Sequence, residues 1–287
     1  MKSNIYVDSS VSNEDFYRYE RSIQVSLDGF SFSIVDVGGE KPRLVAYGFE
    51  SIVATPVALL AVSLAHWLET LPFRNGDFKR NIVVVDLERS LVVPTSMFQK
   101  EDVSLYCDLH FPDFSHEWDS IIWNEVCQSN VGVLFAVPVS LLEVVKRYFE
   151  QFHLIHTQVL LLDEKQFKGP LRKPSLVASV RRRSMNVVLY DEKGCLLLCN
   201  RYDLRGGMDV PFYLFAALKQ NNLNVKASSL CLMGEISLED EEIMLLQSEF
   251  SSVDFYNGGL YIEQQEEVLD APMFQYMPFL NVYRCEL

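Results

Sequence analysis

A turn near the start of the chain carries residues that could bind a phosphate group. In the segment SLDGFSF, residues 26–32, Asp28 and Gly29 are followed by Ser31. A glycine lets backbone amides approach a phosphate, and a carboxylate can hold Mg²⁺ through water. An Asp-Gly pair between alternating apolar residues is also the strongest short-range signal for a β-hairpin, because glycine accepts positive φ. The sequence therefore predicts either a phosphate loop or a plain hairpin here, and the hairpin is favoured.

A second turn carries an island of positive charge. The segment SVRRRSMN, residues 179–186, contains Arg181, Arg182 and Arg183, followed by Ser184. Guanidinium groups bind phosphate and carboxylate groups bidentately, so this turn could hold a phosphate or dock an acidic partner. It could equally be a solvated hairpin tip that neighbouring carboxylates neutralise, which is the favoured interpretation. The turn contains no carboxylate that could hold Mg²⁺.

Two consecutive glycines, Gly206 and Gly207, precede a helix that we expect to begin near Met208. The amide groups at the start of a helix can bind an anion. The favoured interpretation is structural, since two glycines let the chain turn from a strand into a helix and Asp209 can cap that helix.

The histidines and cysteines show no metal-binding pattern. His153 and His156 would suit two ligands on one helix, but no third ligand accompanies them at a regular spacing. Cys195 and Cys199 lie on one expected strand, about 13 Å apart, which is too far for a disulfide bond or a shared metal ion. We therefore expect no metal site, and free thiols in a reducing compartment.

The charge of the chain argues against nucleic acid as a partner. It has 39 Asp and Glu residues against 25 Lys and Arg residues, a formal net charge of −14. Such a field repels nucleic acids and anionic membranes, because both are bound mainly by neutralising phosphates. A ribonuclease-H-like nuclease that uses Asp28 and Asp86 is disfavoured for the same reason. No P-loop, Rossmann glycine pattern, G-x-S-x-G or H-E-x-x-H motif occurs in the sequence.

The apolar segments are interrupted too often to cross a membrane. The longest of them, residues 53–71, contains Pro56, His66 and Glu69. Residues 1–20 are polar and acidic, without the apolar centre of a signal peptide. We therefore expect a cytoplasmic protein without a membrane span.

Apolar periodicity predicts strands and helices in alternation. In the first half we expect strands at 22–27, 31–37, 43–47, 81–87, 90–94 and 131–138, and helices at 55–71, capped by Thr55, and at 139–152. In the second half we expect strands at 175–183, 185–190, 195–204, 228–234 and 253–258, a helix from near Met208, and a helix capped by Ser237. Residues 95–123 mix helix, turn and strand signals and are expected to be an insertion.

Each half contains a three-stranded meander followed by a helix, a strand, a helix and a strand. This repetition indicates an internal duplication, in which Ser26 corresponds to Ser179. Together with the segments SIQVSLDGFSFSIVD, LVVPTSMF and NRYDLRGGMDVPFYLFAAL, it resembles an uncharacterised bacterial family described as a domain of unknown function. That family is similar to the actin-like ATPases, which have a ribonuclease H-like fold and include the bacterial assembly proteins PilM and FtsA.

The resemblance implies an α/β protein with two lobes, each built on a five-stranded mixed sheet flanked by helices. The expected parts are an N-terminal tail at 1–21, a first lobe at 22–168 with the insertion near 95–123, a second lobe at 174–260, and a C-terminal tail at 261–287. The C-terminal tail is rich in aromatic residues and Met, and either packs on the body or offers an apolar strip to a partner.

The resemblance also implies where chemistry would occur. In the active ATPases of this fold, two phosphate loops read Asp-x-Gly and an adenosine loop carries a Gly-Gly pair. This chain has Asp-Gly at 28–29, three arginines at 181–183, and Gly234 followed by Glu235. A glutamate there puts negative charge where a nucleotide would approach. All three loops thus depart from the pattern.

We therefore expect a non-catalytic scaffold that binds a protein partner, without catalytic residues, a metal or a cofactor. The alternative is a weak nucleotide-binding ATPase or kinase-like enzyme that uses ATP and Mg²⁺ in the interdomain cleft. The candidate cleft residues are Asp28, Gly29, Ser31, Arg181, Arg182, Ser184, Gly206, Gly207 and Gly234.

Overall fold

The computed structural model describes residues 4–256, apart from residues 10, 53–55, 74–75, 127–128 and 164–173, and also Val282. Contacts between residues divide the chain into two compact units, with the boundary in the sequence between Val159 and Leu160. The expected connector near residues 165–174 lies almost wholly outside the described residues, as do the expected N-cap Thr55 and nearly all of the C-terminal tail. The predicted domain limits therefore stay predictions.

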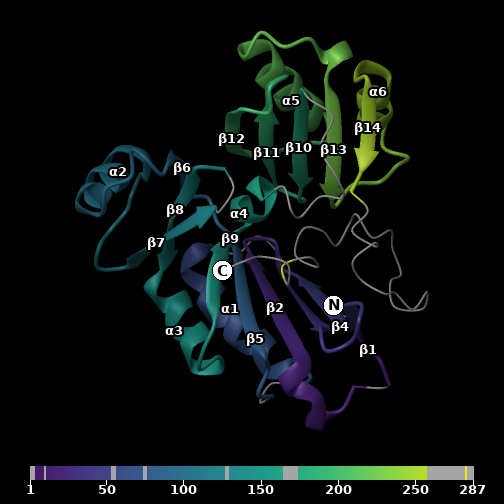
Figure 1. Cartoon of the computed structure of the whole chain (residues 1–287). Helices are drawn as coiled ribbons and strands as arrows, with labels where there is room; N and C mark the ends of the chain where they lie inside the picture. The colour runs from purple at the N-terminus through teal and green to yellow at the C-terminus, as the bar shows by residue number, and fades with distance from the viewer. Residues whose placement is uncertain are drawn as a thin grey trace. The chain divides into compact units, whose positions relative to one another are not determined.

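The first unit contains a six-stranded mixed sheet (Figure 1). Its strands, in order, are β1 (Asn4–Val7), β4 (Arg43–Ser51), β3 (Gly29–Asp36), β2 (Tyr19–Ser26), β5 (Arg80–Asp86) and β9 (His153–His156). Strands β2, β5 and β9 are parallel, whereas β3 runs antiparallel to β2 and β4. Every residue of β2 and β3 is buried, which indicates that both faces of the sheet are covered at these central strands.

The sequence predicts a tail at residues 1–21 and a five-stranded sheet in the first lobe. Strand β1 lies within those residues and adds a sixth strand to the sheet, which corrects this prediction. It pairs antiparallel with β4, from Asn4 opposite Phe49 to Val7 opposite Ala46. Four residues are too few to show a recognisable alternation, but an edge strand such as β4 presents backbone donors and acceptors that a short strand can satisfy.

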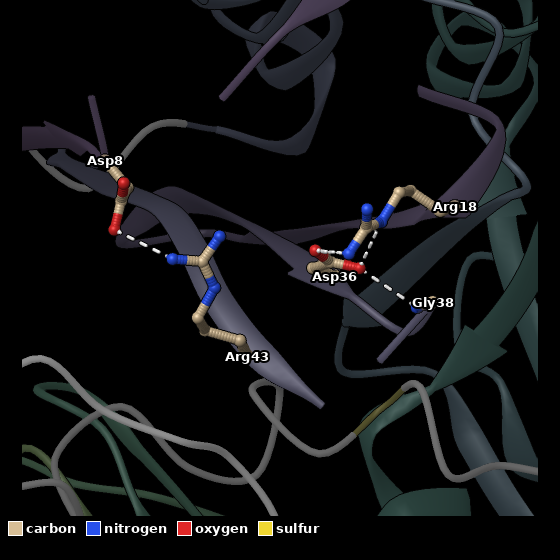
Figure 2. A network of polar contacts seen from close by, with 5 residues as sticks. All are labelled: Asp8, Arg18, Asp36, Gly38 and Arg43. Atoms are coloured by element: carbon tan, nitrogen blue, oxygen red, sulfur yellow. Dashed lines mark hydrogen bonds and ion pairs between the residues drawn. The ribbon is translucent and has the colours of Figure 1, made fainter. Parts of the chain in front are cut away.

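Two ion pairs lie at the ends of strands in this sheet, one between β2 and β3 and one between β1 and β4 (Figure 2). Arg18 donates to both carboxylate oxygens of Asp36, at 2.8 and 2.6 Å, and the amide of Gly38 donates to the same carboxylate at 2.9 Å. The hydrogen bond that Arg18 donates to Asp36 raises the pKa of Arg18. Arg43 lies 3.5 Å from Asp8, which follows β1. Both carboxylates are buried, so the arginines compensate charges that the sheet removes from water.

Two helices pack together beside this sheet, α1 (Val57–Thr70) and α3 (Val139–Tyr148). Helix α1 begins after Pro56 and buries Trp67, whose ring centre lies 5.3 Å from that of Phe30 and 6.2 Å from that of Phe32. The predicted apolar face of the second helix is confirmed by the burial of Leu142, Val145 and Phe149. A short helix, α4 (Thr157–Leu162), follows β9.

The region from residue 90 to residue 138 forms a small antiparallel sheet within the first unit. Its strands, in order, are β6 (Ser90–Pro94), β8 (Val131–Pro138) and β7 (Asp119–Val126), and the helix α2 (Val103–His110) lies on one face. Cys107 and Phe111 pack on Ala136 of β8. The expected insertion at 95–123 therefore contains α2 and the start of β7.

The second unit contains a five-stranded mixed sheet (Figure 1). Its strands, in order, are β12 (Leu196–Asp203), β11 (Ser184–Tyr190), β10 (Ser175–Val180), β13 (Ser229–Gly234) and β14 (Ser252–Phe255). Two helices, α5 (Asp209–Gln220) and α6 (Glu241–Glu249), bury Leu214 and Leu246 in one core with Leu232 of β13.

The start of α6 corrects the prediction of an N-cap at Ser237. The N-cap residue is Asp240, and its carboxylate accepts a hydrogen bond from the amide of Ser237 at 2.9 Å. Residues 237–240 therefore form a turn that precedes the helix.

The two large sheets share one plan. The strands β4-β3-β2-β5-β9 and β12-β11-β10-β13-β14 have the same order and the same relative directions. Mixed sheets with flanking helices are the architecture that the sequence predicts. No helix in the described part of the chain is both long enough and apolar enough to span a bilayer.

Candidate functional site

The first predicted turn is a two-residue connection between β2 and β3, formed by Leu27 and Asp28. The hydroxyl of Ser26 lies 2.6 Å from Oδ1 of Asp28 and 2.8 Å from the carbonyl oxygen of Gly29, and can donate to either. The carbonyl of Asp28 accepts a hydrogen bond from Ile52 at 3.0 Å. These contacts hold the turn within its own sheet, as the hairpin interpretation expects.

Gly29 is needed for space and not for a left-handed backbone. A Cβ at this position would lie 2.6 Å from the carbonyl oxygen of Glu50 on β4. Its φ is not among the positive values of the described residues, so the predicted reason for this glycine is wrong. Ser31 is buried in β3, with its hydroxyl 3.5 Å from Oε1 of Gln24 on β2, and so does not line the turn.

Asp86 lies beside this turn, because it ends β5 in register with Ser26 of the parallel strand β2. The carboxyl ends of parallel strands are where α/β sheets commonly bind ligands. Asp86 is 1% exposed. The described residues contain no group of three or more His, Cys, Asp or Glu side chains that could hold a metal ion.

The second turn is a two-residue hairpin as well, because the amide of Arg181 donates to the carbonyl of Ser184 at 2.8 Å. Arg182 and Arg183 form its exposed tip. The guanidinium of Arg181 lies 3.7 Å from the carboxylate of Glu235, and the two side chains are 16% and 51% exposed. The structure thus pairs two residues that are predicted separately from the sequence. Each residue follows one of two neighbouring parallel strands, and their opposite charges are the signal that could have revealed the ion pair.

Gly234 makes this pairing possible. Its φ is +101°, a left-handed conformation that side chains rarely adopt, and a Cβ would overlap the carbonyl oxygen of Val180. The same carbonyl accepts a hydrogen bond from the amide of Glu235 at 2.8 Å. The bend at Gly234 therefore fixes the backbone of Glu235 beside the end of β10.

The hairpins also define which residues of the two sheets correspond. Ser26 and Arg181 each precede a two-residue turn, and the residues beside them at the ends of β5 and β13 are Asp86 and Glu235. This pairing sets Ser26 against Arg181, two residues beyond Ser179. The predicted alignment of Ser26 with Ser179 is therefore wrong by two residues, which is one repeat of the side-chain alternation in a strand.

The loop ahead of α5 binds a carboxylate of the chain itself. The amides of Arg205 and Gly206 donate to Oδ2 of Asp209, at 2.7 and 3.2 Å. The N-cap residue is Met208, which corrects the N-cap role predicted for Asp209. A Cβ on Gly207 would overlap the carboxylate of Glu242. The amides of Arg205 and Gly206 are thus occupied by Asp209.

The histidine pair does not lie on a helix. His153 and His156 are the first and last residues of β9, so their side chains point to opposite faces. His153 is exposed, whereas His156 is fully buried, with Nε2 3.1 Å from the carbonyl oxygen of Leu87.

The candidate residues thus belong to separate units. Asp28, Gly29 and Ser31 lie in the first, whereas Arg181, Arg182, Ser184, Gly206, Gly207 and Gly234 lie in the second. A shared site between them stays a prediction.

Comparisons with known proteins agree with this architecture. The family model described as Protein of unknown function (DUF3822) matches residues 8–252. A comparison with curated proteins gives no match. A solved protein of Bacteroides thetaiotaomicron VPI-5482, with an actin-like ATPase fold and unknown function, is similar at 22% identity and a TM-score of 0.73, over 87% of this chain and 95% of its own.

A chain of the PilM–PilN type IV pilus biogenesis complex is similar at 15% identity and a TM-score of 0.57, over 92% of this chain and 96% of its own. These likenesses establish the fold, and the family model covers most of the sequence. The chain therefore belongs to the DUF3822 family and has an actin-like ATPase fold, with a distant similarity to PilM.

Proposed function

We propose that this chain is a cytoplasmic, non-catalytic scaffold that binds a protein partner and descends, by internal duplication, from an actin-like ATPase. The observation that carries the proposal is the ion pair between Arg181 and Glu235. At this turn the resemblance implies a carboxylate that holds Mg²⁺, and after Gly234 a second glycine. The chain has a cation in the first place and an anion in the second.

The ion pair also weakens each residue as a ligand for a nucleotide. Arg181 already has a carboxylate at 3.7 Å, so a phosphate would have to compete with Glu235 for it. Glu235 in turn would repel a polyphosphate, by about 1 to 4 kcal/mol at 4 Å for each pair of unit charges, depending on exposure. Neither effect would help an ATPase.

A protein partner is supported by the fold and by the comparison with PilM. PilM, whose structure has this fold, is found in a complex with PilN. A two-lobed body that no longer binds a nucleotide can be kept for its surface, since the fold alone does not prescribe an activity.

The runner-up is a weak nucleotide-binding ATPase or kinase-like enzyme. The specific observation in its favour is the position of Asp86, which ends β5 beside Ser26 and so lies next to the turn of Asp28. Two carboxylates at the carboxyl ends of parallel strands could hold Mg²⁺ for a phosphate.

Titration calorimetry with ATP, ADP and GTP, each with and without Mg²⁺, separates the two functions. We expect no saturable heat at nucleotide concentrations up to about 1 mM. Micromolar binding that disappears in Arg182→Ala and persists in the control Lys193→Ala would overturn the scaffold proposal. Lys193 is a suitable control because it is an exposed cation at the opposite end of β11.

The partner is tested separately. The full chain is used as bait in a lysate of the bacterium that encodes it, and each recovered protein is purified and titrated back. A stoichiometric complex with a Kd in the micromolar range or tighter is expected. If none of the recovered proteins binds the purified chain, the scaffold proposal fails even when no nucleotide binds.

A further inference from the structure

A pocket of about 560 Å³ lies in the first unit, at the edge of the sheet where β5 and β9 begin and α3 ends. Its wall is formed by Arg21 and by residues 76–81 and 148–153. Asp28 and Asp86 lie at the opposite ends of β2 and β5, so the pocket is separate from the turns described above. Its volume is in the range of small-molecule sites.

One residue that lines the pocket is an arginine held in a fixed position. Arg21 is 6% exposed, and its guanidinium carbon lies 4.2 Å from the ring centre of Phe78 and 4.5 Å from that of Phe149. Nε donates to Oδ1 of Asn81 at 2.9 Å and a terminal nitrogen donates to the carbonyl of Phe73 at 3.2 Å. Burial lowers the pKa of Arg21 to about 10, which still leaves it charged at neutral pH.

Further charged side chains surround this arginine. Lys79 and Arg80 line the pocket together with the carboxylates of Asp77 and Glu150. Arg80 is bound to Glu20 at 2.7 Å, whereas Lys79 lies 3.9 Å from the same carboxylate and is 53% exposed. Lys79 can therefore turn towards a ligand at little cost. The lining has three cations and two carboxylates, and Glu20, which binds Arg80, makes the charges equal in number. The pocket therefore lacks the negative charge of the whole chain, which is −14, and can admit an anion at Arg21 and Lys79.

The wall also has an apolar part. Phe152 is half-buried, and with Tyr148 it offers aromatic surface beside the cations. A planar guanidinium recognises carboxylate and phosphate groups, and aromatic side chains bind flat apolar groups. We propose that this pocket binds a small organic anion, with its carboxylate or phosphate group at Arg21 and Lys79 and its apolar body against Phe152.

This inference is independent of the proposed function, because neither Arg182 nor Lys193, the residues changed in the nucleotide titration, lines the pocket.

Phenyl phosphate and benzoate are the probes, and benzyl alcohol is the uncharged control. Binding to the full chain is followed by calorimetry and by the shift in thermal unfolding. We expect at least one anion to bind saturably, more weakly as the salt concentration rises, and the alcohol not to bind; the better of the two anions identifies the group that the pocket prefers.

Three variants locate the site. Lys79→Gln removes an exposed charge and is expected to weaken binding roughly tenfold without changing the unfolding temperature. Arg21→Met keeps an apolar chain between Phe78 and Phe149 and is expected to abolish binding. Lys146→Gln, on the exposed side of α3, is the control with the same change in net charge and is expected to bind like the parent chain.

The proposal is overturned if neither anion saturates, if benzyl alcohol binds as tightly as the anions, or if Lys146→Gln weakens binding as much as Lys79→Gln does. If Arg21→Met does not fold, Lys79→Gln and its control still decide the question, because neither of those side chains is buried.

Discussion

Arg181 and Glu235, which are far apart in the sequence, form an ion pair with a nitrogen-to-oxygen distance of 3.7 Å. The pair connects the β10–β11 turn with the residue that follows β13, beside the parallel pairing of β10 and β13. It therefore holds two loops of the second unit at a fixed spacing, and its energy can be measured.

A double-mutant cycle with Arg181→Gln and Glu235→Gln should give a coupling energy of about 0.2–1 kcal/mol, because Glu235 is half-exposed and solvent screens the pair. Urea unfolding of the four proteins measures it. The coupling should shrink at high salt. A value of zero at low salt would mean that the ion pair does not form in solution.

Gly234→Ala should destabilise the second unit by about 2–4 kcal/mol. An alanine would have to adopt the left-handed φ of +101°, and its Cβ would overlap the carbonyl of Val180. Denaturant unfolding, followed by circular dichroism, measures the loss. A variant as stable as the parent chain would show that the bend after β13 relaxes easily.

Gly29→Ala and Gly206→Ala form a matched pair. The first puts a Cβ 2.6 Å from the carbonyl of Glu50 and should lower the free energy of unfolding by about 1–3 kcal/mol. The second puts a Cβ where no atom lies within 4 Å, and should change stability by less than about 1 kcal/mol in either direction. Equal effects in the two variants would contradict the close approach of β4 to Gly29.

Asp36→Asn should cost about 1–3 kcal/mol of stability, since the buried carboxylate accepts hydrogen bonds from Arg18 and from the amide of Gly38 (Figure 2). Glu249→Gln breaks an ion pair with Lys226 whose side chains are 60% and 40% exposed, and should cost less than about 0.5 kcal/mol. Thermal unfolding ranks the two variants, and the reverse order would refute this account of the Asp36 network.

The cysteines should differ in reactivity towards a thiol reagent. Burial raises the pKa of Cys199 and of Cys231 to about 12, the latter also through the charge of Asp254, whereas Cys195 is exposed. At about pH 8 the half-buried thiols of Cys199 and Cys231 are almost wholly protonated and should react at least tenfold more slowly than Cys195. Mass spectrometry after timed labelling identifies each site. The labelling rates of Cys199 and Cys231 should rise with pH, because the thiolate is the reactive form.

The raised pKa values have a second consequence with a defined sign. Between the ordinary thiol value of 9.0 and about 12, the unfolded chain has lost protons that the folded chain still holds at Cys199 and Cys231. The free energy of unfolding should therefore fall as the pH rises through this interval. Replacing both cysteines with alanine should reduce that slope, and an unchanged slope would show that other groups produce it.

Local sequence patterns predict the kind and order of most elements, but not of β1, α2, β7, β9 and α4. The alternation around Asp28 and Gly29 predicts the β2–β3 hairpin, Pro56 marks the start of α1, and the Lys193–Gly194 turn has the positive φ, +82° at Gly194, that glycine supplies. These features are local, because the side-chain period of an element and the conformations of glycine and proline act within a few residues.

The alignment of the two halves shows where local information ends. Setting Ser26 against Ser179 or against Arg181 keeps the same side chains inside and outside, because a strand repeats every two residues. Only the pairing of whole strands, with Asp86 beside Ser26 and Glu235 beyond Gly234, distinguishes the two registers. The four residues of β1 likewise form a strand only because they pair with the edge of β4.

Tertiary structure alone decided which polar groups meet. It paired Arg181 with Glu235, filled the amides ahead of α5 with the carboxylate of Asp209, and placed the guanidinium of Arg21 between two phenylalanine rings. Each of these contacts depends on how strands and loops are packed together, and the charge or apolar character of one residue does not reveal its partner. The physical reason is that backbone periodicity acts along the chain, whereas ion pairs and pockets form between segments that only the fold brings together.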